Sequence, residues 1–479
     1  MKNTERSTVI KKMLFAGFSL LVLLLLRALP LPGWLTDVPL APLTGAGQAT
    51  VAITVFCLLM WITQALPFHI TGLLALVLFA LFRVDTFNEV VRNGFGSNTV
   101  IFFLSVLILS AFISESGLGR RALTITLSIT GNSTRLILLS FLLVGILATM
   151  WVTAMAVTAM MVPMALEILR REKLEPLKSN FGRALLMSCA YGPVIGGMST
   201  PAGAGCNPLA IEFLRDMAGV EISFLGWMRY GVPCALLLLL PVWFVLTRLF
   251  PPEMACLSVS SEELKAGRKA LPAMSHDEKA TLAVFLLTIL LWLTSTMLEG
   301  WLDIEIPVAM PACLAACLMF LPGMTGIGWK RIEGQISWSG IILILSGISL
   351  GSMLYKTGAA KWMAAVLLGG IGGLPLWVQV FLVAMITILM KVAFSSNTVT
   401  ATIIIPILIA LAAQLNLSPM LLAFPAALAS PLSLILVTSS PNNIIPYSTG
   451  YFTVGDMAKT GLLLMPVAAA VIACVVALA

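Results

Sequence analysis

The stretch Lys391–Pro406 combines small hydrogen-bonding side chains with apolar flanks. Its centre reads Ser395-Ser396-Asn397-Thr398, and apolar sequence lies on both sides of it. In hydrocarbon an unpaired polar group is costly, so backbone at membrane depth leaves helical form only inside protein or beside a water-filled cavity. A polar break between two apolar helical arms is therefore a candidate binding site for a small polar ligand. The alternative interpretation is a cluster that only bonds neighbouring helices.

The residue types at this break suit two kinds of ligand. Ser396, Asn397 and Thr398 offer side-chain donors, and helix N-termini add backbone N–H groups whose dipole favours an anion such as a carboxylate. A sodium ion needs oxygen ligands, and Ser395, Ser396 and Asn397 are the candidates here. An isolated Ser or Thr often bonds back to its own helix, but the clustering at the break favours ligand binding.

Lys391 lies in the apolar arm just before this break. Ionisable residues inside a membrane are rare and are functional candidates by default. The alternative is that the side chain extends to the membrane interface. That route is difficult if the break lies at the midplane, because the lysine precedes Ser396 by about 7.5 Å of helix. We therefore include Lys391 among the candidate substrate-binding residues.

The composition is that of a membrane protein. The chain has 479 residues, of which 59% are hydrophobic and only 10% are charged, whereas soluble domains carry about 25% charged residues. The net charge of +7 comes from Lys and Arg in loops, where they set membrane orientation, so we do not expect a nucleic-acid partner. The eight cysteines are scattered without a disulfide or metal-binding pattern, and no organic cofactor is expected.

Apolar runs predict an all-α polytopic membrane protein with about eleven transmembrane helices and two re-entrant hairpins. The hairpins are 135–169, which is broken near 151–155, and 376–411. The predicted spans are 13–30, 50–66, 71–84, 98–116, 185–214, 230–250, 281–298, 305–322, 340–355, 420–449 and 459–478, with additional arms at 120–133 and 359–373.

The distribution of Lys and Arg supports this count. With a cytoplasmic N terminus and hairpins that return to their own side, the basic segments 2–12, 170–183 and 248–279 all lie in the cytoplasm. This is the bias that the positive-inside rule requires, and it places the C terminus outside. A hairpin that crossed the membrane would weaken the bias. We expect a bacterial-type plasma membrane location.

Similar elements recur in the same order in the two halves of the chain. Ser105–Gly117 resembles Ser346–Gly358, and the hairpin break at Thr153 matches the one at Ser396. The distribution of loop charges predicts that the two hairpins open to opposite sides of the membrane. The repeats are therefore inverted, which is a transporter architecture. The predicted domains are a first repeat over 1–250 with hairpin 135–169 and broken helix 185–214, a cytoplasmic linker over 251–279, and a second repeat over 280–479 with hairpin 376–411 and broken helix 420–449.

The repeat extends the candidate site beyond the second hairpin. A third pair of breaks joins Ser199-Thr200-Pro201 and Asn207 with Ser439-Ser440-Pro441-Asn442-Asn443. The further candidate substrate-binding residues are Thr153, Asn207, Ser440, Pro441 and Asn443, and the further candidate sodium ligands are Thr149, Thr153, Gly196, Gly197 and Ser439.

At these residues the chain resembles the divalent anion/sodium symporter family, of the solute carrier 13 type. The resemblance covers nearly the whole chain and is most specific at Ser396-Asn397-Thr398. Ser440-Pro441-Asn442-Asn443 is similar to the Thr-Pro-Pro-Asn of that family, and Tyr191–Thr200 with Asn207 looks like its first-repeat partner. The resemblance implies a homodimer, an elevator-like motion of a transport domain, and a dicarboxylate, tricarboxylate or sulfate held between the hairpin tips.

The first half departs from the family pattern. Where the family has Ser-Asn-Thr at the first tip, this chain has Thr153-Ala154-Met155, so an amide and a hydroxyl are lost. The first-half Thr-Pro-Pro-Asn appears as Ala204-Gly205-Cys206-Asn207. A separate Ser97-Asn98-Thr99 precedes an uninterrupted span, and we interpret it as a helix cap.

We therefore expect a cation-coupled secondary transporter of small divalent organic anions, such as succinate, malate, fumarate or tartrate, with sodium ions and protons as the alternative coupling ions. The alternatives are a sulfate or tricarboxylate transporter, a sodium-independent anion exchanger, and a channel, which shares the broken helices. An intramembrane hydrolase is a remote alternative, because the two histidines, His69 and His276, lie far along the chain from the polar breaks. The first hairpin tip has lost an amide and a hydroxyl, and Lys391 adds a fixed cation, so we expect coupling to few sodium ions or none.

Overall fold

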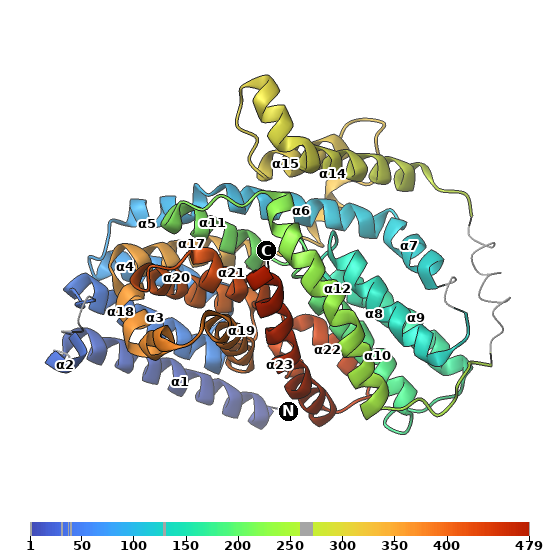
Figure 1. Ribbon diagram of the computed structural model, residues 1–479, viewed down its shortest axis with the longest axis horizontal. Helices are drawn as coiled ribbons and strands as arrows, with labels where there is room; N and C mark the ends of the chain where they lie inside the picture. Colours follow the sequence, from blue (N-terminus) through green and yellow to red (C-terminus); the bar gives the residue numbers. More distant parts are fainter. Residues whose placement is uncertain are drawn as a thin grey trace. The chain divides into compact units, whose positions relative to one another are not determined.

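The computed structural model in Figure 1 describes residues 2–29, 32–36, 38, 41–127, 131–258 and 272–478. Within these ranges the fold is helical, and the one strand-like feature is a bridge between Ser133 and Cys256. The helices are α1 (Lys2–Ala28), α2 (Gly33–Thr36), α3 (Gly45–Thr63), α4 (Phe68–Leu81), α5 (Phe87–Phe95), α6 (Asn98–Glu115), α7 (Leu118–Leu127), α8 (Thr134–Thr149), α9 (Ala154–Arg171), α10 (Asn180–Gly196), α11 (Cys206–Ala218), α12 (Phe224–Leu249), α14 (His276–Leu302), α15 (Ala309–Met319), α16 (Trp329–Glu333), α17 (Trp338–Lys356), α18 (Ala359–Leu368), η1 (Gly369–Gly373), α19 (Leu376–Ala393), α20 (Asn397–Gln414), α21 (Pro419–Ala429), η2 (Val437–Ser439), α22 (Pro441–Tyr447) and α23 (Val454–Leu478).

The helices have the length and composition of membrane spans. Nine helices in the described part of the chain are long and apolar enough to cross a bilayer, and several shorter apolar helices accompany them. Large apolar side chains such as Leu240 on α12 and Leu290 on α14 are more than half exposed. In lipid such exposure is not costly, whereas unpaired backbone is, so the helical form follows from the solvent. The predicted all-α polytopic membrane fold is confirmed.

The observed helices follow the predicted apolar runs closely, with differences where short amphipathic segments intervene. The short helices α2, α5 and α16 were not predicted. Helix α5 contains Asn88, Glu89 and Arg92, so it is too polar for a span, and it buries only Val90 and Gly94. Residues 259–271 of the predicted linker and residues 128–130 of the predicted arm lie outside the described residues.

The chain divides into two compact units, each built from separate stretches of sequence. Unit 1 comprises 1–100, 209–221 and 337–427, and unit 2 comprises 101–208, 222–336 and 428–479. Each unit therefore draws on both predicted repeats. The division into inverted repeats on either side of 251–279 stays a prediction. The second hairpin, α19 and α20, belongs to unit 1, whereas the first hairpin, α8 and α9, belongs to unit 2.

Unit 2 is organised around the close packing of α8 and α10. A Cβ atom on Gly145 of α8 would lie 2.8 Å from the ring of Pro193 and 2.9 Å from Gly192 on α10. A Cβ atom on Gly196 would meet the carbonyl oxygen of Ile146. Small residues let the two backbones approach, as is usual where membrane helices associate by van der Waals contact. This packing brings the end of α8 to the end of α10.

Unit 1 is organised around α17, which packs against α4, α5 and α20. Ser349 of α17 donates a hydrogen bond to the carbonyl oxygen of Val90 on α5, at 2.7 Å. Helix α20 is buried along most of its length, and it carries Asn397 at its first position. The arm of the second hairpin that lies most deeply in unit 1 is thus the one that begins at the predicted site.

Candidate functional site

The first hairpin reverses at residues 150–153, close to the predicted break. Helix α8 ends at Thr149, and α9 begins at Ala154 after Thr153, whose side chain makes no capping bond. The backbone N–H of Thr153 donates instead to Oγ of Ser110, at 3.0 Å. The Trp151 ring stacks with Phe224 and Trp292, with ring centroids 6.0 and 6.5 Å away. The tip of this hairpin is therefore held in unit 2 by an aromatic stack and a hydroxyl.

The predicted broken helix 185–214 overlaps α10 and α11, with an irregular segment between Gly196 and Cys206. Asn207 closes this segment, because its Nδ2 donates to the carbonyl oxygens of Gly197 and Thr200, each at 2.7 Å. Thr200 in turn donates from Oγ1 to the carbonyl oxygen of Met150, at 2.5 Å. The break in the helix and the tip of the first hairpin are thus directly bonded.

The second broken helix repeats this arrangement, and its break lies in unit 2. Helix α21 ends at Ala429 and α22 begins at Pro441, with the short η2 between them. Nδ2 of Asn443 donates to the carbonyl oxygens of Ser433 at 2.9 Å and Leu436 at 3.3 Å. These acceptors lie 10 and 7 residues before the asparagine, which are the same separations as for Asn207. Helix α22 also packs against α9 and α10.

Four buried oxygen atoms at these breaks have no hydrogen-bond partner among the described residues. They are Oγ1 of Thr149, Oγ of Ser199, Oγ of Ser439 and Oδ1 of Asn443. Each of these side chains is at most 2% exposed. A buried polar atom without a partner costs about 1–3 kcal/mol, so unpaired atoms of this kind need an explanation, such as an unseen ion. Oxygen atoms are the ligands that hard cations prefer.

Two of these unpaired hydroxyls belong to residues that are chain neighbours of the bonded pair Thr200 and Met150. Thr149 directly precedes Met150, and Ser199 directly precedes Thr200, so the two unpaired hydroxyls flank the bond that joins tip and break. The predicted sodium ligands Gly196 and Gly197 lie on the same segment. Sequence reasoning included Thr149 but missed Ser199, although the Ser-Thr-Pro break contained it.

Neither asparagine has a side-chain donor left for a ligand, and Oδ1 of Asn207 already accepts from Cys206 Sγ at 3.5 Å. Both hydrogens of Asn207 Nδ2 and both hydrogens of Asn443 Nδ2 go to backbone carbonyls. The remaining Oδ1 of Asn443 can accept from a donor or coordinate a cation, but it cannot donate to a carboxylate. The Asn443 side chain therefore suits a cation better than an anionic substrate.

The second hairpin reverses at residues 394–396 in unit 1. Ser396 caps α20, because its Oγ accepts from the N–H of Val399 at 3.4 Å. Its carbonyl oxygen accepts from Thr400 Oγ1 at 3.1 Å, and Oγ of Ser395 accepts from Gln64 Nε2 at 3.3 Å. These oxygens of Ser395 and Ser396 are therefore engaged by donors of the protein itself.

Lys391 reaches the same tip from the last turn of α19. Its Nζ donates to Oδ1 of Asn397 at 2.5 Å. The lysine is only 2% exposed, so the side chain does not extend to the membrane interface. Two residues that the sequence singled out separately, Lys391 and Asn397, thus form one pair.

Ser97 caps α6, as predicted, and Ser97 and Thr99 also bind an acid that sequence reasoning missed. Thr99 N–H donates to Ser97 Oγ at 3.0 Å. The two hydroxyls donate to the carboxylate oxygens of Glu212, at 2.7 and 2.8 Å, and Arg215 lies 2.9 Å from it. Glu212 is 3% exposed. An acidic residue inside the apolar run 185–214 was the signal that could have found it.

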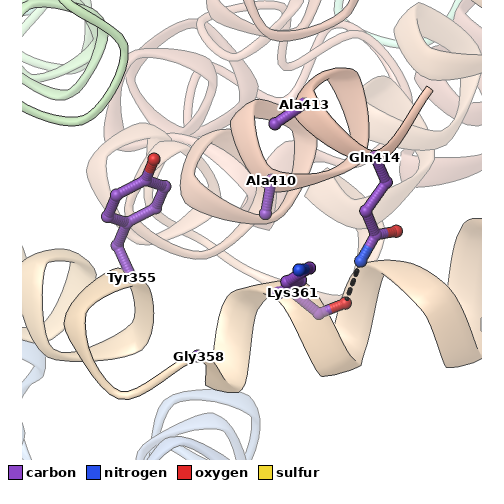
Figure 2. A pocket seen from close by; sticks show the side chains of 6 residues that line it. All are labelled: Tyr355, Gly358, Lys361, Ala410, Ala413 and Gln414. Atoms are coloured by element: carbon purple, nitrogen blue, oxygen red, sulfur yellow. Dashed lines mark hydrogen bonds between the residues drawn. The ribbon is translucent and has the colours of Figure 1, made fainter. Parts of the chain in front are cut away.

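A cavity of about 360 Å³ lies at the far end of α20 from the tip (Figure 2). Gln414 donates from Nε2 to the carbonyl oxygen of Lys361 at 2.8 Å across this hollow. Asn397 and Gln414 are the two ends of α20, about 26 Å apart along the helix axis. The cavity is therefore separate from the second tip. Its lining residues are Tyr355, Gly358, Lys361, Ala410, Ala413 and Gln414.

Comparison with known proteins covers nearly the whole chain. Residues 18–478 match the family described as the sodium:sulfate symporter transmembrane region. A sodium-dependent dicarboxylate transporter, SdcS, of Staphylococcus saprophyticus is 31% identical over 436 residues, which is 88% of this chain and 83% of that one. The SdcS of Staphylococcus aureus strain USA300 is 29% identical over 449 residues, covering 90% and 85%. The crystal structure of the Alcanivorax borkumensis YdaH transporter has a similar fold, with a TM-score of 0.56, 15% identity, and 82% and 87% of the two chains covered.

Proposed function

Because this chain belongs to the sodium:sulfate symporter family, we propose that it is a secondary transporter that carries small dicarboxylates across the plasma membrane and is driven by a cation gradient. The relatives over most of its length are named sodium-dependent dicarboxylate transporters. The family resemblance of the two hairpin tips and two broken helices favours the same substrate class. It also favours a homodimer and an elevator-type motion.

The observation that carries this proposal is the set of unpaired buried oxygens in unit 2. Thr149 and Ser199 lie at the first break, and Ser439 and Asn443 lie at the second. Water or a sodium ion can satisfy such atoms, and a sodium ion coordinated there would offset their desolvation cost. The Asn207 and Asn443 amides donate to carbonyls within the breaks and fix the non-helical backbone there, so the ligand set is prepared before the ion arrives.

The anion needs donors, and each hairpin tip supplies them. Helices α9 and α20 both begin at a tip, and the N–H groups of their first turns favour a carboxylate there. The predicted substrate-binding residues Ser396, Asn397 and Thr398 open α20, and Thr153 precedes α9. Sodium binding at the breaks would add positive charge to unit 2 and would raise the affinity for a dianion, which is the basis of coupling.

Uptake into proteoliposomes tests the function directly. The purified protein should take up labelled succinate faster with an inward sodium gradient than with choline, and excess unlabelled malate should compete. Citrate and sulfate should enter more slowly. If citrate or sulfate entered faster than succinate, or if succinate moved only in exchange for internal anion whatever the sodium gradient, the proposal would be wrong. Liposomes containing heat-denatured protein serve as the control.

A further inference from the structure

Lys391 is a buried charged residue that donates to an oxygen of the second hairpin tip. It lies in α19, which is apolar enough to span the membrane, and it is 2% exposed. Its Nζ lies 2.5 Å from Oδ1 of Asn397, the first residue of α20. Burying an ammonium group is costly unless it is paired, and an intramembrane lysine usually marks a functional position.

The pair changes what the second tip can bind. An oxygen that accepts a bond from an ammonium group is not available to a sodium ion. A sodium ion on the same oxygen would lie close to the ammonium group, and the two cations would repel strongly in a medium of low dielectric. The neighbouring oxygens are engaged as well. Ser396 caps α20 through its Oγ and accepts from Thr400 through its carbonyl, and Ser395 accepts from Gln64.

We propose that the Lys391 ammonium is a built-in cation that takes the place of a co-transported sodium ion at the second hairpin tip, where it supplies the positive charge that an anionic substrate requires. This inference rests on the proposed function, because it names the source of charge at one of the tips. The lysine is covalently attached, so this charge returns with the protein and is not spent from the sodium gradient in each cycle.

A purely structural role is the competing explanation. In that case Lys391 would only tie the last turn of α19 to the first turn of α20, and its neutral replacement would leave sodium binding unchanged. If Lys391 is instead a built-in cation, its neutral replacement should increase sodium binding. Removing the charge removes the repulsion that excluded a sodium ion from the second tip.

The experiment counts bound sodium on purified protein in lipid nanodiscs, using radioactive sodium at equilibrium without substrate. Lys391→Met removes the charge at nearly constant length. Lys391→Gln is also neutral and remains polar, so it serves if the Met variant does not fold. Lys391→Arg keeps the charge. Lys361→Met is the matched control, because Lys361 is an exposed lysine of the same unit.

We expect each neutral Lys391 variant to bind about one more sodium ion per chain than the parent, whereas Lys391→Arg and Lys361→Met keep the parent number. The thermal stabilisation that sodium gives should increase in the neutral variants. An unchanged sodium count in a folded neutral variant would overturn the inference. Because no transport is measured, failure of the parent to carry dicarboxylates would refute the proposed function alone.

Discussion

The helix breaks in unit 2 and the hairpin tip of unit 1 differ in whether their oxygen atoms have hydrogen-bond partners. In unit 2 the oxygens of Thr149 and Ser199 are buried without partners. In unit 1 the oxygens of Ser395, Ser396 and Asn397 all accept from the protein, and the last of these accepts from an ammonium group. An oxygen left unpaired is available to a mobile cation, whereas one that already faces a fixed cation is not. Similar sequence motifs can therefore serve different ions.

The largest effect is expected from Asn397→Ala. This change leaves the Lys391 ammonium buried without its acceptor and removes an amide from the tip, so succinate uptake should fall to background. The loss of a hydrogen bond to a charged group costs about 1.5–3 kcal/mol. Labelled succinate uptake by proteoliposomes with equal amounts of protein is the measurement.

Asn98→Ala is the matched control, because Asn98 occupies the middle of the other Ser-Asn-Thr and is exposed. It should retain most of the parent uptake. Near-normal uptake by well-folded Asn397→Ala would remove the second tip from the site.

The orientation of the two hairpins is the next comparison to test. The charge pattern predicts that the loop around residue 177, after α9, is cytoplasmic, and that the loop around residue 416, after α20, is outside. Cysteines at these positions on a cysteine-free background should react with an impermeant maleimide from one side only. Labelling of both positions from the same side would reject the inverted arrangement.

A smaller effect is expected from Thr149→Val. The change replaces an unpaired buried hydroxyl with a methyl group of similar size, so the sodium-free protein should be slightly more stable. The sodium concentration for half-maximal uptake should rise about tenfold, which is a loss of about 1.4 kcal/mol of binding free energy. Thermal unfolding with and without sodium measures the first effect, and uptake against sodium concentration measures the second.

The control for this change is Thr288→Val, since the Thr288 hydroxyl donates within its own helix, to the carbonyl of Val284 at 2.8 Å. It should leave the sodium response at the parent value. If Thr149→Val lowered stability without affecting sodium dependence, the hydroxyl would be structural.

The smallest effect is expected from Glu212→Gln. The carboxylate accepts from Ser97 and Thr99 and pairs with Arg215, which is partly exposed. Neutralising the carboxylate weakens these bonds, so we expect a stability loss of about 1–2 kcal/mol. Thermal unfolding in detergent would measure it. A loss of sodium coupling with unchanged stability would instead show that Glu212 takes part in transport.

The sequence predicted the architecture because the membrane restricts what a chain can do. Apolar runs must become helices in lipid, and a polar interruption such as Ser395–Thr398 must lie inside protein. The breaks at 150–153 and 394–396 therefore appear within a few residues of their predicted positions. The proximity of Lys391 to Asn397 was also foreseeable, because both are local to one hairpin.

What the sequence could not predict depends on contacts between distant residues. Glu212 meets Ser97 and Thr99 across more than a hundred residues, and no periodicity signals that pairing. The sequence also could not predict that both N–H groups of the Asn443 side chain donate to backbone carbonyls. The residue type suggests a donor for an anion, whereas the bonded geometry leaves an acceptor for a cation.

The most direct test of the account is a pair of high-resolution cryo-electron microscopy maps of the protein in nanodiscs, one in sodium chloride and one in choline chloride. We predict a density that depends on sodium, within coordination distance of the Thr149 and Ser199 hydroxyls. We also predict continuous density from Lys391 to Asn397 in both maps. A sodium-dependent density on Asn397 Oδ1, with the lysine turned away, would contradict the account.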